Sequence, residues 1–393
     1  MATVHYYTNI MSETDFGDIR PYTDEEAVEA LARVSRHPMM PIISKYLFPD
    51  LPIGTLSKML RKFNSIDQFQ DEVMSAVIES ILDQTSEGFT ATGTENFKKD
   101  GKKTFLAVSN HRDIVLDPAL VQYALLHSGC PFSEICVGSN LLSNKLIEDL
   151  MRSNRMIKVI RGIGARELYL SSQRLSAYIR ESVSTGRSPV WIAQREGRTK
   201  DGNDTTEQGL LKMFDMSGKG SFEENFKELN IIPLSISYEF EPCDAKKARE
   251  VLLRRKGPYV KKKKEDLHSI MTGIRQQKGH IHLEVGEPLS AEEIAKAASY
   301  NGNDRYQAIR HTLDNRIIKG YKLWPSNYIA HDLLSGTDEY ANFYDSEQKQ
   351  GFIQYMNHKL QKVSLGVDRD ELQKVFLGIY ANPIDRKKEI AGQ

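Results

Sequence analysis

The sequence lacks any uninterrupted run of about 18 apolar residues, which a transmembrane helix would need. Its first residues, MATVHYYTNIMSETDFGD, lack the basic segment and the apolar core of a secretory signal. Cysteine is scarce, and Cys130, Cys136 and Cys243 show neither CxxC nor metal-ligand spacing. We therefore expect no spanning helix and no secretion leader. The thiols fit small core residues in a reducing cytoplasm.

An excess of charge of one sign is also missing. The 53 basic and 53 acidic residues cancel, so no global field directs the chain to nucleic acid. The sequence contains no Gly-rich phosphate loop, no DFG, and no zinc, flavin or nucleotide motif, so we predict no cofactor. With 393 residues, 40% hydrophobic and 27% charged, the chain is typical of a soluble globular protein of one large domain or two.

The most informative stretch is TFLAVSNHRDIVLDPA, Thr104 to Ala119. Residues 104–108 read as a short buried strand, and Pro118 suits the first turn of a helix with Asp117 as its N-cap. His111 therefore falls at a strand-to-helix corner. Open α/β folds bind ligands at this carboxyl edge of the sheet.

An imidazole at such a corner supplies a base near neutral pH, and Asp113 or Asp117 could fix its tautomer. The plainer alternative is a histidine satisfied in the core beside an aspartate that only caps a helix. HRD also begins the protein-kinase catalytic loop, but that loop needs an Asn where this chain has Pro118. The sequence therefore fits a kinase poorly, and the role of the His–Asp pair depends on the rest of the chain.

Four segments between residues 104 and 238 resemble, in order, the four motifs of the glycerolipid acyltransferases, the superfamily of glycerol-3-phosphate and 1-acylglycerol-3-phosphate acyltransferases. The first is SNHRDIVLD, and the second is IKVIRG, Ile157 to Gly162. The third is VWIAQREGRTK, Val190 to Lys200, and the fourth is IIPLSISY, Ile231 to Tyr238. Each motif lies at the end of a predicted strand, and together they are much more specific than any one alone.

The first motif departs from the family pattern. The family has four residues between His and Asp, which would place the carboxylate at Leu116, but here Asp117 is one position later. We favour Asp117 as the partner of His111, with Asp113 as the rival. By resemblance, His111 is the general base that takes the acceptor's hydroxyl proton while the carboxylate holds the ring. Such base catalysis contributes about 10² to 10⁴ in rate.

The resemblance also implies a phosphate-binding set. Arg161 ends the second motif and Arg198 follows Glu196 and Gly197 in the third, where the family usually has a Thr before the basic residue. Either Arg198 or Lys200 could therefore bind the anion, while Glu196 could bind another acceptor hydroxyl or orient an arginine. The plainer interpretation is a surface ion pair and an ordinary turn. No metal ligand is expected in this set.

Strands and helices alternate from residue 104 to about 286, which predicts an α/β fold with a mixed central sheet flanked by helices. We expect a helical N-terminal region at 1–100, an acyltransferase domain at 101–290 and a helical C-terminal region at 291–393 packed on it. Residues 85–103 read as a loop, and 200–221 as a loop with one or two helical turns. The expected elements are helices at 118–128, 143–153 and 167–185, the last ending at Gly186, and strands at 135–138, 157–162, 231–238 and 281–285.

The two helical regions have their own signals. Thr23 with Glu26 and Ser290 with Glu293 have capping-box spacing, and residues 66, 69, 73, 77 and 81 recur on one helical face. Between the capping box at Thr23 and the apolar face that starts at residue 66 lies PMMPIISKYLFPDLPIGTLSKML, which is apolar but interrupted by prolines. We expect this stretch to pack irregularly in the core or to lie in a membrane interface. In the C-terminal region, RIIKGYKLWPSNYIAHDLL is expected to pack on the α/β domain, with an acyl-chain groove as the alternative.

Two further features concern partners. Residues 244–264 contain ten Lys or Arg and only two acidic residues. We call this range the basic segment. It is either a solvated face, or a surface for an anionic leaflet, an acidic acyl carrier protein or the phosphates of CoA. His280 and His282 lie two apart on a predicted strand, but without a third ligand we expect no metal site there.

The sequence thus predicts an enzyme that moves a fatty acyl group from acyl-CoA or acyl carrier protein to a glycerol-phosphate-type acceptor, foremost 1-acylglycerol-3-phosphate. It would act in phospholipid synthesis, in the cytoplasm, peripherally on the inner face of the cell membrane. The alternatives are a glycerol-3-phosphate or amino-acid-lipid acyltransferase, a thioester hydrolase, and a non-catalytic membrane-binding scaffold.

Overall fold

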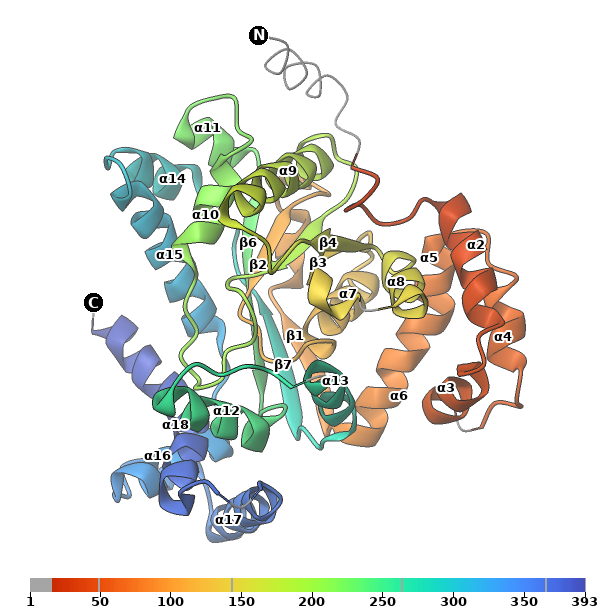
Figure 1. The fold of residues 1–393 in the computed structure, drawn as a ribbon. Coiled ribbons are helices and arrows are strands. Elements are labelled where there is room, and N and C mark those ends of the chain that lie inside the picture. The colour runs from red at the N-terminus through yellow and green to blue at the C-terminus, as the bar shows by residue number, and fades with distance from the viewer. Residues whose placement is uncertain (1–15, 49, 143, 263, 365, 393) are drawn as a thin grey trace.

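A single seven-stranded sheet forms the centre of the protein, with the strand order β1-β7-β6-β2-β5-β3-β4 (Figure 1). The computed structural model describes residues 16–48, 50–142, 144–262, 264–364 and 366–392. Neighbouring strands are parallel except β6 and β7, which are antiparallel. The predicted mixed sheet flanked by helices is confirmed. The strands are β1 (Gly88–Thr92), β2 (Leu106–Ser109), β3 (Glu134–Gly138), β4 (Met156–Val159), β5 (Val190–Ala193), β6 (Ile231–Tyr238) and β7 (His280–Val285).

Because β2 to β6 run in the same direction, their carboxyl ends meet at one edge of the sheet. The helices that connect these strands are α7 (Leu116–His127), α8 (Lys145–Arg152), α9 (Ala165–Ser184), α10 (Gln208–Asp215) and α11 (Phe222–Lys227). Gly186, with φ of +76°, follows the end of α9 as predicted. The strands of the four motifs, β2, β4, β5 and β6, therefore all end at this edge.

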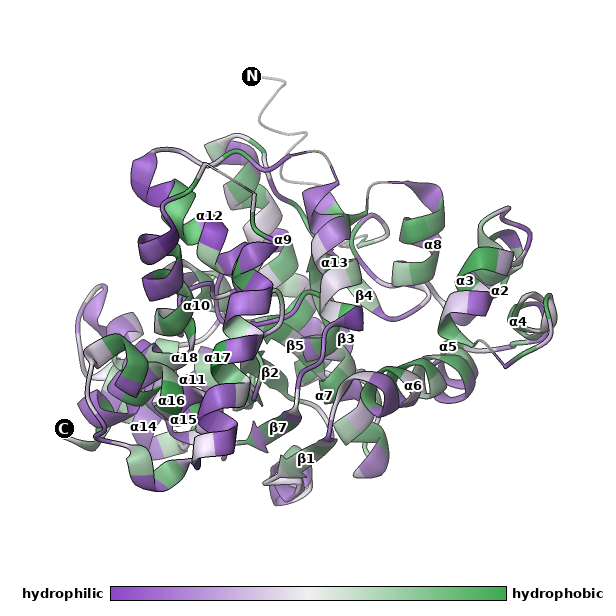
Figure 2. Cartoon of the chain, turned by 90° about the horizontal axis from the view of Figure 1, so that it is seen from below, coloured by the Kyte–Doolittle hydropathy of each residue, from purple (hydrophilic) through white to green (hydrophobic). Residues whose placement is uncertain are grey.

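The core lies on both faces of the sheet because side chains alternate along each strand. On β2 and the residue before it, Phe105 and Ala107 join the apolar cluster with α7 and the N-terminal helices. Leu106 and Val108 join the cluster formed with α9, α10 and α15 (Asp304–Gly320). Figure 2 shows the outer helices, such as α6, carrying both apolar and polar residues along their length. Both faces of the sheet are thus covered by helices. We therefore look for a site at the carboxyl ends of the strands.

The N-terminal region is helical, as predicted, with α2 (Asp24–Ser35), α3 (Met40–Leu47), α4 (Thr55–Leu60), α5 (Ile66–Phe69) and α6 (Ser75–Thr85). A π-helical turn at Gln70–Met74 joins α5 to α6. The predicted apolar face is buried, and the capping box of Thr23 and Glu26 is present. The proline-broken stretch forms α3 and α4, although Pro49 lies outside the described residues, as do residues 1–15 of the predicted non-signal N-terminus.

The C-terminal part contains α14 (Ala291–Ala298), α15, α16 (Pro325–Ser335), α17 (Ser346–Gln361) and α18 (Arg369–Ala391). Ser290 and Glu293 form the predicted capping box. Ile317, Tyr321, Trp324 and Ile329 of the apolar stretch are buried, which confirms that it packs into the core. Among the described residues, no helix combines the length and apolarity needed to cross a membrane.

One prediction about the loops is wrong. The Gly-, Thr- and Lys-rich stretch at 85–103 contains strand β1, which pairs in parallel with β7 at the edge of the sheet, followed by the 3₁₀ segment Thr94–Gly101. The alternating burial of β1 is shallow because one of its edges faces solvent. Two short 3₁₀ turns, Ser139–Leu141 and Ala341–Phe343, complete the described elements.

Candidate active site

The strand-to-helix corner after β2 is fixed from two sides. The side chain of Asn110 donates to the carbonyl of Ile236 at 2.9 Å and accepts from the amide of the same residue at 2.8 Å, so it binds β6 like a short strand. On the other side, the amide of Thr199 donates to the carbonyl of His111 at 2.7 Å. The backbone that carries His111 is therefore held between the ends of β5 and β6.

Asp117, not Asp113, is the partner of His111. Its Oδ2 lies 2.9 Å from Nδ1 of the imidazole, although one more residue separates the pair than the family pattern has. The carboxylate is fully buried, and it also accepts from the amides of Arg112 and Asp113 and from the hydroxyl of Tyr238 at 2.7 Å. Four donors therefore hold an anion beneath the ring, and Nδ1–H can be one of them.

Burial, followed by the negative charge of Asp117, raises the pKa of Tyr238 well above its ordinary value. Tyr238 therefore stays a neutral donor to the carboxylate. The other ring nitrogen of His111, Nε2, has no hydrogen-bond partner within the described part of the chain, and 14% of the side chain is exposed. The ring thus has one nitrogen engaged and one free to exchange a proton with a ligand.

The predicted N-cap role of Asp117 is wrong. Helix α7 begins at Leu116, two residues before the predicted start at Pro118, so Asp117 lies inside its first turn. The carboxylate of Asp117 turns back into the corner. Asp113 instead holds the turn before the helix, because its Oδ1 accepts from the amides of Val115, the N-cap residue, and Leu116, the first helical residue, at 2.9 Å each. The additional residue between His and Asp is therefore accommodated by a second aspartate that starts the helix.

The second and third motifs meet across the end of the sheet. Arg161, after β4, forms an ion pair of 3.7 Å with Glu196, after β5, and Glu196 is 69% exposed. Gly138 at the end of β3 makes room for the arginine, since a Cβ there would lie 3.0 Å from its guanidinium. Gly197 has φ of +71°, a turn that only glycine adopts at little cost. An exposed ion pair of this length is weak, so Arg161 can exchange Glu196 for an anionic ligand.

Arg198 and Lys200, the two candidates for anion binding, differ in their surroundings. Lys200 is paired with Glu250 at 2.5 Å, and burial is the main cause that lowers its pKa, helped by Arg254. Arg198 is 9% exposed, and its Nη1 is buried without a hydrogen-bond partner among the described residues. An unpartnered buried guanidinium costs free energy that an anion would offset. Arg198 is therefore the better candidate.

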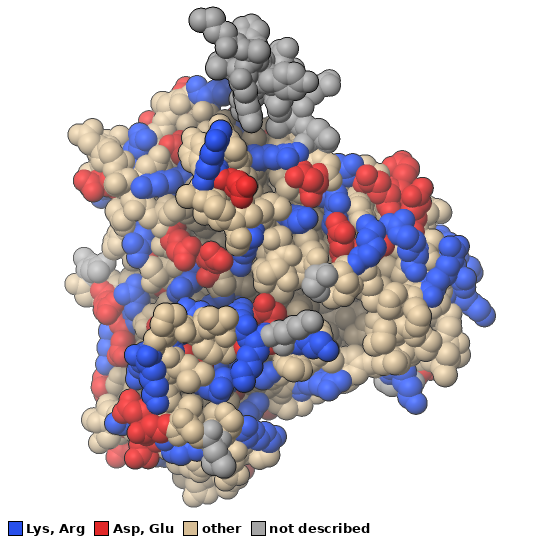
Figure 3. All heavy atoms as spheres, in the orientation of Figure 1, with Lys and Arg blue, Asp and Glu red and all other residues tan. Residues whose placement is uncertain are grey.

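The basic segment lies at this site, which sequence reasoning did not place. It forms α12 (Asp244–Lys256) and the loop leading to α13 (Glu265–Arg275), and Figure 3 shows Lys and Arg gathered over these elements. Lys247 donates to the carbonyl of Arg112 at 2.6 Å. Burial lowers the pKa of Lys246, and the charge of nearby Arg198 lowers it further. The only signal in the sequence was the position of the segment directly after the fourth motif.

Helix α13 closes the other side of the corner. Its Gly273 lies against the carboxylate of Asp113, where a Cβ would collide, and Asp266 accepts from Asn140 in the β3–α8 loop at 3.1 Å. A cleft of about 280 Å³ lies between α3, α6 and α13, lined by Leu47, Val77 and Ile274 among others. The corner is thus roofed by the segment between β6 and β7.

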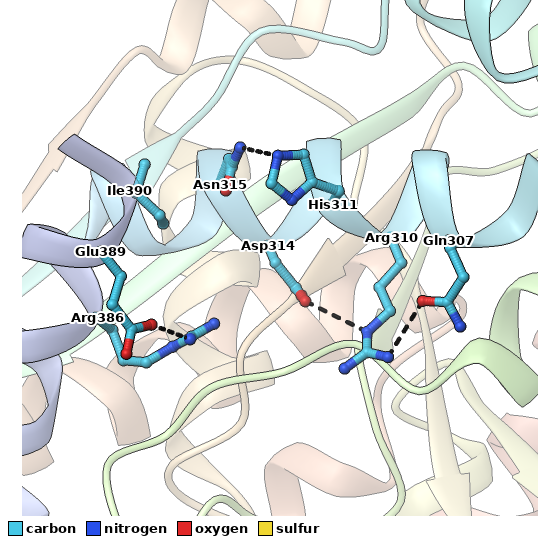
Figure 4. Close-up of a pocket in the computed structure, with 8 residues that line it drawn as sticks. All are labelled: Gln307, Arg310, His311, Asp314, Asn315, Arg386, Glu389 and Ile390. Carbon is cyan, nitrogen blue, oxygen red and sulfur yellow. Dashed lines mark hydrogen bonds and ion pairs between the residues drawn. The ribbon is translucent and has the colours of Figure 1, made fainter. Parts of the chain in front are cut away.

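Two other features lie apart from the motifs. A cleft of about 250 Å³ between α15 and α18 is lined by Arg310, His311, Asp314 and Arg386 among others, and none of them belongs to a motif (Figure 4). His280 lies with Glu87 and Glu239 in an exposed group whose ligand atoms are within 4.8 Å of one another, so these three could hold a metal. His282 is not part of the group, because its ring bonds to Thr90 and Thr92.

Two comparisons find known proteins to which this chain is similar. The chain is similar over residues 88–237 to a family model described as Acyltransferase, and this range contains the first three motifs and all but the last residue of the fourth. It is also similar to the crystal structure of the 1-acyl-sn-glycerophosphate (LPA) acyltransferase PlsC from Thermotoga maritima, at 10% identity and a TM-score of 0.40. That alignment covers 76% of this chain and 94% of that chain. No curated protein sequence matches the chain significantly. The family model thus matches the part of the chain whose motifs resemble those of the glycerolipid acyltransferases.

Proposed function

We propose that this protein transfers a fatty acyl group from an acyl thioester to a hydroxyl of a glycerol-phosphate-type acceptor, with 1-acylglycerol-3-phosphate as the favoured acceptor. The observation that carries the proposal is the pairing of His111 Nδ1 with the buried Asp117 at 2.9 Å, with Nε2 left free. An alcohol is a weak nucleophile at neutral pH, so its attack on a thioester needs a base at this position.

In the proposed reaction, Nε2 of His111 takes the proton of the acceptor hydroxyl as the oxygen attacks the thioester carbonyl. Asp117 keeps the proton of the ring on Nδ1 and stabilises the imidazolium that forms. The hydroxyl of Tyr238 and two backbone amides hold this carboxylate in place. The proton on Nε2 then passes to the departing thiolate, so neither a covalent acyl-enzyme nor a cofactor is needed.

The acceptor's phosphate would lie at the ends of β4 and β5. Arg198 offers a buried, unpartnered guanidinium nitrogen, and Lys246 adds a second positive charge next to it. Two neighbouring cations favour a dianion. Arg161 can join them by giving up its long contact with Glu196. With glycerol-3-phosphate as acceptor, the released carboxylate could bind the second hydroxyl, which 1-acylglycerol-3-phosphate lacks. Lys200 stays with Glu250 and acts only as support.

We further propose that the enzyme works peripherally on an anionic membrane surface in the cytoplasm. Ile42 on α3 and Ile53 before α4 are 62% and 78% exposed, and Val260 in the basic segment is 83% exposed. Exposed aliphatic residues combined with lysines are typical of surfaces that enter the headgroup layer. Such contact would bring a lipid acceptor to the site without a spanning helix. The donor is acyl-CoA or acyl carrier protein.

The alternatives use the same corner differently. Glycerol-3-phosphate or an amino-acid lipid would replace the lysophospholipid as acceptor, and a thioester hydrolase would direct the base at water. A non-catalytic scaffold would bind membranes without turnover, but the intact contact between His111 and Asp117 speaks against a decayed site.

The experiment measures thiol release from acyl-CoA and from acyl carrier protein thioester, with and without each candidate acceptor. The acyltransferase predicts release that depends on an acceptor phosphate and is lost in His111→Ala. Release without acceptor indicates a hydrolase. Absence of release with every donor and acceptor, from folded protein on vesicles, would contradict the proposal. The matched control is His127→Ala, a histidine at the far end of α7 that bonds only to its own helix.

A further inference from the structure

A buried network of four charged side chains lies directly under the catalytic corner. Nη2 of Arg112 is 2.5 Å from Asp204, and its Nη1 is 3.4 Å from Glu241. Lys247 lies 2.5 Å from the other oxygen of Glu241. None of these side chains is more than 6% exposed. Two positive and two negative charges therefore balance one another inside the protein.

The charge of Arg112 is maintained by its two carboxylate neighbours. Burial alone would lower the pKa of Arg112, but Asp204 and Glu241 raise it well above its ordinary value. The ring of Tyr321 adds a cation–π contact, with the guanidinium carbon 4.9 Å from the ring centre. Arg112 is thus permanently charged and held in one direction.

Stability alone does not account for such a network. Apolar residues of similar volume often replace buried ion pairs without loss, because the desolvation penalty offsets the attraction between the charges. Charge-assisted hydrogen bonds add something that apolar packing lacks, namely a fixed direction and length. These bonds give a fixed position to one group at the corner.

That group is the backbone of His111 and Arg112. Lys247 donates to the carbonyl of Arg112 at 2.6 Å, and the amide of Thr199 donates to the carbonyl of His111 at 2.7 Å. The side chain of Arg112 anchors the same segment from below, through Asp204 and Glu241. The peptide next to the proposed base is therefore fixed at three points.

The network also reaches distant parts of the chain. Asp204 accepts from Asn110 at 3.2 Å, and the amide of Glu241 donates to the hydroxyl of Tyr380 on α18 at 3.0 Å. The corner after β2 is thus connected to the loop after β5, to α12 and to the C-terminal helices.

We propose that Arg112, Asp204, Glu241 and Lys247 are positioning residues for His111. They hold the corner backbone so that Nδ1 meets Asp117 and Nε2 faces the acceptor. None of the four touches the reacting atoms. The inference rests on the proposed role of His111, but the contact that it concerns, Nδ1–H to Asp117, can be measured without turnover.

The test uses Glu241→Gln, which keeps the shape of the side chain and removes its charge, and Asp204→Asn as a second variant. The matched control is Glu134→Gln, because Glu134 is also buried and paired with an arginine, Arg187 at 2.9 Å, but begins β3 at the opposite edge of the sheet. Two quantities are measured in each folded variant. One is the proton resonance of His111 Nδ1–H, assigned by its loss in His111→Ala, and the other is kcat with the acceptor KM.

We expect Glu241→Gln and Asp204→Asn to broaden or shift the Nδ1–H resonance and to lower kcat by about tenfold to a hundredfold. The acceptor KM should stay within about twofold, because phosphate binding is untouched. Arg112→Lys should retain more activity than Arg112→Met. Glu134→Gln should alter neither quantity.

Three results would overturn the inference: an unchanged resonance and kcat in both network variants, an equal loss in Glu134→Gln, or a change confined to KM. If the wild-type protein turns over no acceptor, the proposed function fails, and the resonance alone still decides whether the network positions His111.

Discussion

Replacing Asp117 by Asn should nearly abolish turnover while leaving the fold intact. The carboxylate accepts four hydrogen bonds, from His111, two backbone amides and Tyr238, and it is fully buried. Asn retains one acceptor oxygen for the corner, but it removes the negative charge that stabilises the imidazolium. Comparable changes in Ser-His-Asp triads lower kcat by about 10⁴. We expect a loss of about 10² to 10⁴, or about 3 to 5 kcal/mol in the activation barrier.

Asp113→Asn is the matched comparison, because the same substitution occurs four residues away. The side chain of Asp113 accepts from the amides of Val115 and Leu116 at the start of α7, and Asn can still accept from them, so we expect kcat to change by less than about tenfold. The assay measures acceptor-dependent thiol release at saturating substrates, and a thermal melt of each variant reports its fold. If Asp113→Asn lost more activity than Asp117→Asn with both folds intact, our assignment of the partner of His111 would be refuted.

Three further predictions concern phosphate, membrane and stability. Arg198→Ala should raise the acceptor KM by at least tenfold with a smaller effect on kcat, since a charge-assisted bond to phosphate contributes about 1.5 to 3 kcal/mol; an unchanged KM would remove Arg198 from this role. The double variant Lys261→Glu, Lys262→Glu should bind anionic vesicles at low salt at least tenfold more weakly, because each basic residue near the surface contributes about 1 kcal/mol. The control Lys219→Glu, outside the basic segment, should bind like the wild type. Equal binding by all three proteins would show that the basic segment is only a solvated face. Burial lowers the pKa of Lys278 from 10.5 to about 8. The unfolded chain therefore binds more protons between these pH values, and the free energy of unfolding gains up to about 3 kcal/mol from this group as pH rises from about 8 to 10.5. Urea unfolding of Lys278→Met should lack that rise, and parallel pH curves for the two proteins would contradict it.

The elements near the site could be predicted because their signals are local. Apolar runs that end in Asn-His, Arg-Gly or Glu-Gly predicted β2, β4 and β5, and the fourth-motif strand has the predicted bounds, Ile231–Tyr238. The choice between Asp113 and Asp117 could not be made locally, because both carboxylates lie within reach of the corner. It was decided by where α7 begins, which depends on the amides that Asp113 binds.

The remainder depends on contacts between distant residues. Strand β1 has a weak composition for a strand and exists because it pairs with β7, almost two hundred residues later. Likewise, no periodicity reveals that Lys247 reaches the carbonyl of Arg112, or that Glu250 engages Lys200. The place of the basic segment over the site therefore required the structure. Lys263 within that segment and Ser143 at the predicted start of α8 lie outside the described residues.

The central claim is our proposal that the protein transfers an acyl group to a lipid-phosphate hydroxyl, with His111, paired with Asp117, as the general base. The most direct test is mass-spectrometric detection of diacylglycerol phosphate formed from 1-acylglycerol-3-phosphate and an acyl thioester by the wild-type protein and by His111→Ala. Our account predicts product with the wild type and none above background with His111→Ala. Equal product from both proteins would contradict the role of His111, and release of free fatty acid without any acylated acceptor would contradict the transfer itself.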